Sequence, residues 1–466
     1  MPSTDPALLS ATELLALYAK KKLSPVEATK AALARIATLD PRFNAFCLVD
    51  ERHALAAARA SEARWHKGKP VGAVDGVPAT VKDLLLAKGW PTLRGSKAVK
   101  RNQDWNEDAP VVARLREQGA VLLGKTTTPE FGWKGVTDSP LTGITRNPWD
   151  PTKTPGGSSG GAAVAAACGM GALHLGTDGG GSIRIPASFT GIFGFKQTYG
   201  RVPAHPLSPF GTVAHVGPMT RTVADAALML NVLALPDPRD WYALPYDGAD
   251  YTKGLGKGVK GLKVAFSPSL GGNRVQPEVA KIVAEAVHVF SKELGAKVEE
   301  TEVRFENVAD VFVKHWFPGA ANALRAYTAA QRKRMDPGLI EIAKAGARIP
   351  LMDYLAAVKA REAMGVAMNR FHERYDLLLT PMMPLTAFEA GHELPPDDEE
   401  GRWTDWSPFS YPFNLTQQPA ASVPCGFTRA GLPVGLQIVG ARYADALVLR
   451  AARAFERVRP FALPRL

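Results

Sequence analysis

Two glycine-flanked serines, separated by an alanine-rich segment, constrain this chain more than any other feature. Ser158 lies within Gly-Gly-Ser-Ser-Gly-Gly, and Ser182 follows three consecutive glycines, Gly179 to Gly181. The intervening residues 160–170 carry almost no polar side chain and predict a buried helix, because alanine favours helices and packs closely. Glycine runs let backbone N–H groups turn toward a ligand, so the loop before Ser182 suits an oxyanion hole. On glycine content alone, two flexible loops with incidental serines remain the alternative.

An upstream lysine favours the catalytic interpretation. Residues 76–83 read GVPATVKD and place Lys82 after a short apolar run that predicts a strand. Followed by PGGSSGG at 155–161 and GTDGGGSIR at 176–184, in this order and spacing, this pattern resembles the amidase signature family. The resemblance is strongest over about residues 65–235 and returns near the C-terminus at residues 413–426.

The resemblance implies a Ser–cis-Ser–Lys triad. By position, Ser182 would be the nucleophile, Ser158 the bridging serine and Lys82 the base. The chemistry is coherent, since a serine hydroxyl needs an adjacent base and a lysine can act as one only when its environment keeps it neutral. The family also implies that the Gly157–Ser158 peptide bond is cis, which only a well-held backbone tolerates.

The same resemblance assigns the oxyanion hole and suggests the substrate pocket. The oxyanion donors would be the backbone N–H groups of Gly179, Gly180, Gly181 and Ser182. Residues with a predicted place in the pocket are Phe131, Gly132, Trp133, Gly157, Tyr411 and Phe413. For each aromatic residue, a place in the packed core is the alternative. Asp178 and Arg184 bracket the nucleophile loop, and we assign both a structural role.

Alternating short strands and helices after Val71 predict an α/β fold. Capping patterns predict helices that begin at Ser10 and at Ser24, and the second is expected to end near Asp40-Pro41. The resemblance implies one domain over residues 1–466, with a mixed central β-sheet covered by helices on both faces. Its signature core would span about 65–235 and a substrate-dependent variable region about 305–410.

Composition argues against several classes of protein. The net charge is +11, but the basic residues are spread along the chain, which favours a solvated surface over a nucleic-acid site. Three cysteines far apart favour a reduced compartment over a disulfide framework. The sequence shows neither a signal-peptide pattern nor a long apolar run, so we expect a cytoplasmic protein without membrane attachment.

Two other catalytic interpretations fail on the pattern of residues. Residues 119–126 match the P-loop letters, but the residues between Gly119 and Gly124 are Ala-Val-Leu-Leu, which predict a strand instead of a phosphate-binding loop. His174, His205 and His215 form no recognised constellation with Ser182. The chain also lacks the HExxH and CxxC patterns, and we expect neither a metal nor a cofactor.

These observations predict an amidase that cleaves a C–N bond of a small, aryl or hydrophobic amide or carbamate through a Ser182 acyl-enzyme. The expected partner is the small-molecule substrate alone, and the expected state is a monomer or homodimer. The alternative is the glutamine-hydrolysing amidase component of a tRNA-dependent amidotransferase, whose relatives hold the glutamine amino group with an acidic residue. The corresponding position here is Ser407, with Asp405 nearby, which weakens that alternative. A binding protein without catalysis is a third hypothesis, which the intact triad residues argue against.

Overall fold

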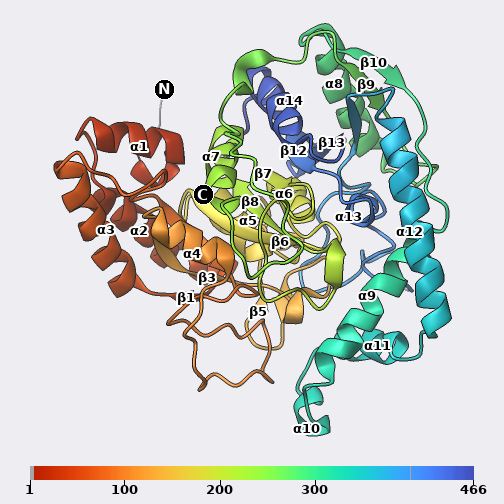
Figure 1. The fold of residues 1–466 in the computed structure, drawn as a ribbon, viewed down its shortest axis with the longest axis horizontal. Helices are drawn as coiled ribbons and strands as arrows, with labels where there is room; N and C mark the ends of the chain where they lie inside the picture. The colour runs from red at the N-terminus through yellow and green to blue at the C-terminus, as the bar shows by residue number, and fades with distance from the viewer. Residues whose placement is uncertain (1–4, 399) are drawn as a thin grey trace.

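The fold is built around one eleven-stranded mixed sheet (Figure 1). The computed structural model describes residues 5–398 and 400–466. Across the sheet the order is β1 (Phe46–Val49), β3 (Val121–Thr126), β2 (Pro78–Lys82), β6 (Leu173–Asp178), β8 (His215–Thr220), β7 (Phe193–Lys196), β12 (Ala420–Phe427), β13 (Pro433–Gly440), β11 (Leu377–Pro381), β9 (Lys263–Phe266) and β10 (Lys297–Glu300). A separate two-stranded ladder joins β4 (Asp138–Ser139) and β5 (Gly143–Ile144).

Parallel pairing between β2 and β6 brings distant parts of the chain together. Ala79 pairs with Leu173 and Thr80 with His174, so the two strands end at the same edge of the sheet. Lys82 is the last residue of β2, and Asp178, the last of β6, leads directly into the glycine loop. The predicted base and the predicted nucleophile loop therefore meet because two neighbouring strands run in the same direction.

Helices cover both faces of the sheet, as predicted. One face packs against α1 (Ala11–Ala19), α4 (Pro110–Glu117), α7 (Val223–Leu233), α8 (Pro277–Lys292) and α14 (Asp445–Val458). The other packs against α2 (Pro25–Phe43), α3 (Glu51–His66), α5 (Gly160–Ala167) and α6 (Arg184–Thr190). The remaining helices are α9 (Val308–Leu324), α10 (Ala329–Arg332), α11 (Pro337–Gly346), α12 (Leu351–Phe371) and α13 (Pro412–Leu415). Figure 1 shows α9–α12 at the end of the molecule opposite α1–α3.

Local sequence signals account for most helix boundaries. Ser10 and Ser24 both form the predicted capping boxes, each with a glutamate three residues later. The prediction that α2 ends near Asp40-Pro41 is wrong, because the helix continues to Phe43 with Pro41 inside it. The stop is Asn44, which adopts a left-handed conformation, while the Asp40 carboxylate accepts hydrogen bonds from the N–H groups of Ala45 and Phe46.

The alanine-rich helix predicted between the two serines is α5, and all eight of its residues are buried. Small side chains allow this, since Gly160 and Gly161 lie so close to Thr137 and Thr127 that an added Cβ would meet their hydroxyls at 2.4 Å. No helix within the described residues is long and apolar enough to cross a membrane.

Candidate active site

Lys82 is fully buried at the end of β2, and its ammonium nitrogen contacts only hydroxyl groups. Nζ lies 2.7 Å from Ser158 Oγ, 2.8 Å from Ser159 Oγ and 2.9 Å from Thr177 Oγ1. Within the described part of the chain, Lys82 forms no ion pair. This side chain therefore has three polar partners and no neutralising carboxylate in contact.

Burial lowers the pKa of Lys82 well below its ordinary value of 10.5, and the more distant charge of Asp178 opposes this shift only in part. Desolvation disfavours the charged amine, while hydroxyl partners can donate to a neutral amine as readily as they accept from a charged one. The environment therefore favours the free base, which is the form that can remove a proton.

Ser158 and Ser182 lie just before the starts of two different helices. Ser158 and Ser159 precede α5, and the Gly157–Ser158 peptide bond is cis, as predicted. Ser182 lies at the start of the turn that leads into α6, and its carbonyl oxygen accepts a 3.1 Å hydrogen bond from the N–H of Ser159. The hydroxyl-bearing residues Ser158 and Ser182 line the same cavity.

A buried ion pair fixes the loop that carries Ser182. Arg184 Nε donates to Asp178 Oδ2 at 2.9 Å, and both side chains are inaccessible to solvent. Asn414 Nδ2 donates to Asp178 Oδ1 at 2.8 Å, which ties the loop to α13. Although burial alone would raise it, the Arg184 contact holds the pKa of Asp178 below its ordinary value. The structural role predicted for Asp178 and Arg184 agrees with this geometry.

One of the four backbone N–H groups predicted to form the oxyanion hole already has a hydrogen-bond partner in the structure. The N–H of Gly181 donates to Asp178 Oδ1 at 2.7 Å, so this group maintains the loop and is removed from the predicted set. The N–H groups of Gly179, Gly180 and Ser182 form no hydrogen bond within the described residues. They remain the donors that could stabilise an oxyanion.

The glycines of this loop are also required by close packing. A Cβ on Gly179 would lie 2.7 Å from the Trp316 ring, and one on Gly180 would lie 2.6 Å from the Trp403 ring. Gly181 has φ +120°, and its Cβ would lie 2.6 Å from Ser410. The rings of Trp316 and Trp403 therefore pack directly against this loop.

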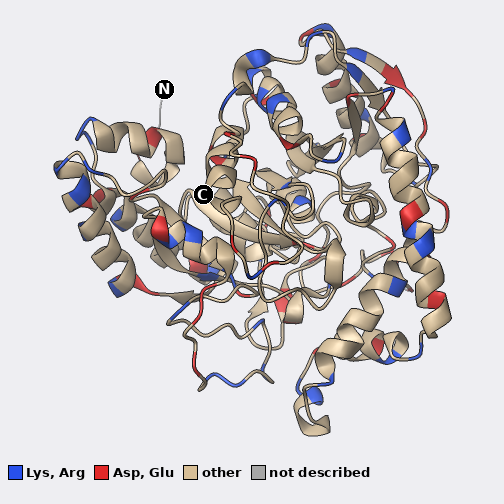
Figure 2. Cartoon of the chain, viewed as in Figure 1, with Lys and Arg blue, Asp and Glu red and all other residues tan. Residues whose placement is uncertain are grey.

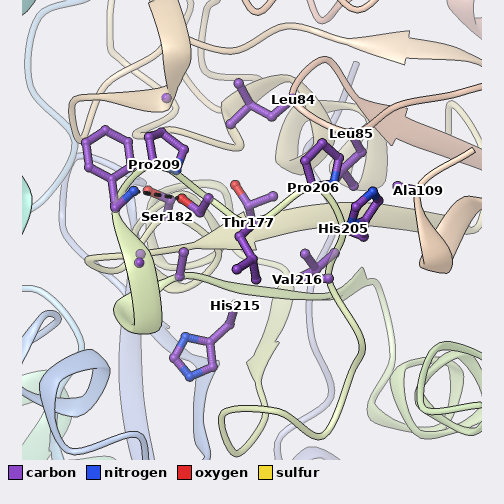
Figure 3. A pocket seen from close by; sticks show the side chains of 18 of the residues that line it. Leu84, Leu85, Ala109, Thr177, Ser182, His205, Pro206, Pro209, His215 and Val216 are labelled. Carbon is purple, nitrogen blue, oxygen red and sulfur yellow. Dashed lines mark hydrogen bonds between the residues drawn. The ribbon is translucent and has the colours of Figure 1, made fainter. Parts of the chain in front are cut away.

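A cavity of about 360 Å³ opens beside Ser158 and Ser182. Its walls are mostly apolar, and Figure 3 shows Leu84, Leu85, Pro206 and Pro209 around Thr177 and Ser182. Trp316, Ala323 and Tyr327 contribute from the predicted variable region, while Tyr199 to Phe210 supply a proline-rich wall. The polar side chains that line it include Arg94, Gln197 and Asp240.

Only part of the predicted substrate pocket lies at this cavity. Phe131 and Gly132 line it. Trp133, Gly157, Tyr411 and Phe413 are not among its lining residues.

The contacts of these four residues explain why they lie away from the cavity. The Trp133 carbonyl accepts a hydrogen bond from Trp316 Nε1 in the aromatic core. Tyr411 stacks on Phe312 with a ring separation of 4.7 Å, and Phe413 packs against Phe305. Gly157 is a close-packing position, since a Cβ there would lie 2.4 Å from the Val136 carbonyl oxygen.

The structure also argues against a nucleotide-binding P-loop and against a histidine as the catalytic base. Lys125 of the P-loop-like stretch is buried within β3 and pairs with Asp83 at 2.9 Å. His174 Nδ1 lies 2.9 Å from Thr80 Oγ1, and burial lowers the pKa of His174 to about 3. The His215 ring points away from Ser182 and Thr177 (Figure 3), with Nδ1 held by the Val213 carbonyl.

Two residues in contact with Lys82 are absent from the sequence prediction. Ser159 directly follows the bridging serine and also contacts the Thr177 carbonyl oxygen at 3.1 Å. Thr177 is the residue before Asp178 in β6. Their positions inside the two motifs were visible in the sequence, but the direction of their side chains was not.

The comparisons with known proteins agree with this geometry. The sequence pattern of the family described as Amidase matches residues 27–449. The chain belongs to the amidase family. This amidase is 40% identical over 462 residues to an acylamidase of Rhodococcus erythropolis, with 97% of this chain and 96% of that protein covered.

Two further relatives have names that denote different activities. A glutamyl-tRNA(Gln) amidotransferase component of Myxococcus xanthus is 38% identical to the amidase, with 99% of each chain covered. A solved bacterial aryl acylamidase of the amidase signature family superposes with a TM-score of 0.90 at 34% identity, covering 97% of this chain and 96% of that one. The reaction of this amidase is therefore hydrolysis of an amide C–N bond.

Proposed function

We propose that this amidase cleaves small amides or carbamates with an aryl or other apolar portion, through an acyl-enzyme on Ser182. The observation that carries the proposal is Lys82, which is buried and bonded only to hydroxyls at the edge of an apolar cavity that Ser182 lines. An apolar cavity with few polar groups suits a small apolar ligand.

In this proposal protons pass through Ser158. Ser182 Oγ attacks the carbonyl carbon, its proton moves to Ser158, and the Ser158 proton moves to neutral Lys82. The N–H groups of Gly179, Gly180 and Ser182 stabilise the oxyanion. Ser158 then gives a proton to the leaving nitrogen and takes one back from Lys82, the C–N bond breaks, and the amine departs. Water attacks the acyl group by the same route, giving the carboxylic acid and free Ser182.

Glutamine hydrolysis is the second candidate, because the amidotransferase components match along the whole chain. A glutamine α-ammonium needs a carboxylate in the pocket. Asp240 is the only acidic side chain of the described residues that lines the cavity, and its oxygens already accept from the N–H groups of Ala204 and Tyr242. Ser407 is buried, and its hydroxyl donates to the Trp403 carbonyl. These features favour apolar amides.

The test is release of amine or ammonia from a panel of substrates by wild type and Ser182→Ala. The panel contains p-nitroacetanilide, phenylacetamide, a short aliphatic amide, an aryl carbamate and glutamine. We expect turnover of the aryl substrates that disappears in Ser182→Ala and persists in Ser291→Ala, a control on the exposed side of α8. Preference for glutamine, or activity that survives in Ser182→Ala, would contradict the proposal.

A further inference from the structure

The outermost helix of the molecule, α12, carries an exposed apolar strip that the rest of the chain does not cover. Leu351 and Met352 are 69% and 71% exposed, and Leu355 and Val366 are each 46% exposed. The helix is anchored through its opposite side, where Ala357, Met364 and Met368 are buried. Contiguous exposed apolar side chains on one helix face are typical of an interaction surface.

Six exposed positions of α12 form a seam with the spacing of a coiled coil, and the exposed side chains of Leu351, Tyr354 and Val358 lie beside it. Positions 352, 355, 359, 362, 366 and 369 alternate steps of three and four residues, which is the a/d pattern of a helix that packs along another helix. The residues at these positions are Met352, Leu355, Lys359, Glu362, Val366 and Asn369, and all are exposed.

This seam is complementary to itself when a second copy runs antiparallel. Centred between positions 359 and 362, the pairing places Leu355 against the partner's Val366 and Lys359 against the partner's Glu362. Two-fold symmetry makes each of these contacts twice. Figure 2 shows both acidic and basic residues along the ribbon of α12.

The two central charges are available for such a contact. Neither Lys359 nor Glu362 has an ion-pair partner within the described residues. A parallel pairing in register would instead set Lys359 against the partner's Lys359 and Glu362 against the partner's Glu362. The charge pattern therefore selects the antiparallel orientation.

We propose that this face of α12 is the interface of a homodimer, formed by antiparallel packing of α12 against α12 of a second copy. The helix has 21 residues, or a length of about 31 Å, so one helix pair buries less surface than a standard interface. We therefore expect a reversible dimer with a dissociation constant on the order of 10 µM.

The interface also bears on the active site. On its inner side, Arg361 of α12 donates to the Leu415 carbonyl at 2.7 Å and to Thr212 Oγ1 at 2.8 Å. Thr212 lies between Phe210 and Ala214, which both line the catalytic cavity. Dimerisation would thus restrain a helix that holds one wall of the pocket in place.

Charge reversal tests the proposal by sedimentation velocity across a wide concentration range. Lys359→Glu sets Glu against the partner's Glu362, and Glu362→Lys sets Lys against the partner's Lys359, so each variant alone should dimerise at least about tenfold more weakly. An equimolar mixture of the two variants should form a heterodimer, because both central pairs are then of opposite charge. The double variant Lys359→Glu/Glu362→Lys should recover the wild-type dimer.

Lys281→Glu, a charge reversal at an exposed residue of α8 that is not part of the seam, is the matched control and should leave association unchanged. A wild-type protein that stays monomeric at every concentration would overturn the proposal. So would a dimer that both single variants retain, or a mixture that associates no better than its components.

Discussion

Two buried lysines on neighbouring strands have opposite surroundings. Lys82 on β2 and Lys125 on β3 lie one register position apart in a parallel pair, and both are inaccessible to solvent. Burial lowers the pKa of each. Lys125, however, pairs with the Asp83 carboxylate at 2.9 Å, whereas the nitrogen of Lys82 meets only three hydroxyls.

This difference is the reason why we propose Lys82, and not Lys125, as the base. A carboxylate in contact stabilises the ammonium and makes the side chain part of a buried ion pair. Hydroxyl partners leave the neutral amine as the favoured form and provide a path for its proton. Lys125, the ion-paired lysine, lies in the stretch that matches the P-loop letters. Lys82 is the lysine that the sequence predicts as the base.

The largest expected effect is on activity at Lys82. Lys82→Met should lower kcat/KM by about 10²- to 10⁴-fold, because the proton acceptor of the relay is lost. The folded state should lose less stability than Lys125→Met does, since no ion pair is broken. Steady-state kinetics and thermal unfolding of the same preparation check both expectations. A variant with near-wild-type kcat/KM would show that another group is the base.

Lys125→Met should lower the stability of the protein and leave its activity unchanged. Removing the lysine leaves the Asp83 carboxylate buried without its partner, which costs about 3–5 kcal/mol of unfolding free energy. Urea denaturation measures this loss, and the remaining folded protein should retain the wild-type kcat. Adding Asp83→Asn should recover part of the lost stability, because the uncompensated charge is gone. Equal stability of Lys125→Met and wild type would remove the distinction between the two lysines.

The smallest effect is expected at the two hydroxyls beside the catalytic serines. Ser159→Ala and Thr177→Val each remove one of three hydrogen bonds to Lys82 Nζ, a change of about 1 kcal/mol. We expect kcat to fall by about fivefold to tenfold, with little change in KM for Ser159→Ala. Ser188→Ala, at another buried serine of the neighbouring helix α6, is the control. A loss as large as that of Lys82→Met would mean that Ser159 belongs to the relay itself.

Most of the site follows from local sequence, because its residues lie in short motifs at strand and helix ends. Lys82 closes a strand, Ser158 precedes a helix, and Ser182 follows a strand-ending aspartate. The parallel β2–β6 pairing then brings these ends together.

The pocket walls could not be predicted in the same way. Nearness in sequence to a motif does not decide which side of the backbone a ring occupies, so Phe131 faces the cavity while Trp133 lies in the core. Tyr411 stacks on Phe312 of α9, and Phe413 packs edge-to-face on Phe305 in the segment before it. Both contacts are long-range in the sequence. For the cavity wall formed by residues 199–210, the prolines were the only feature of the sequence that could have indicated it.

The most direct test of the central claim is the pH dependence with which a fluorophosphonate labels Ser182. A neutral Lys82 must accept the proton that Ser182 releases, so the labelling rate should rise with pH as Lys82 deprotonates. We predict that it levels off well below pH 10.5, the ordinary pKa of a lysine, and that Lys82→Met abolishes this dependence. A rate that titrates near the ordinary lysine pKa, or that is unchanged in Lys82→Met, would contradict the account.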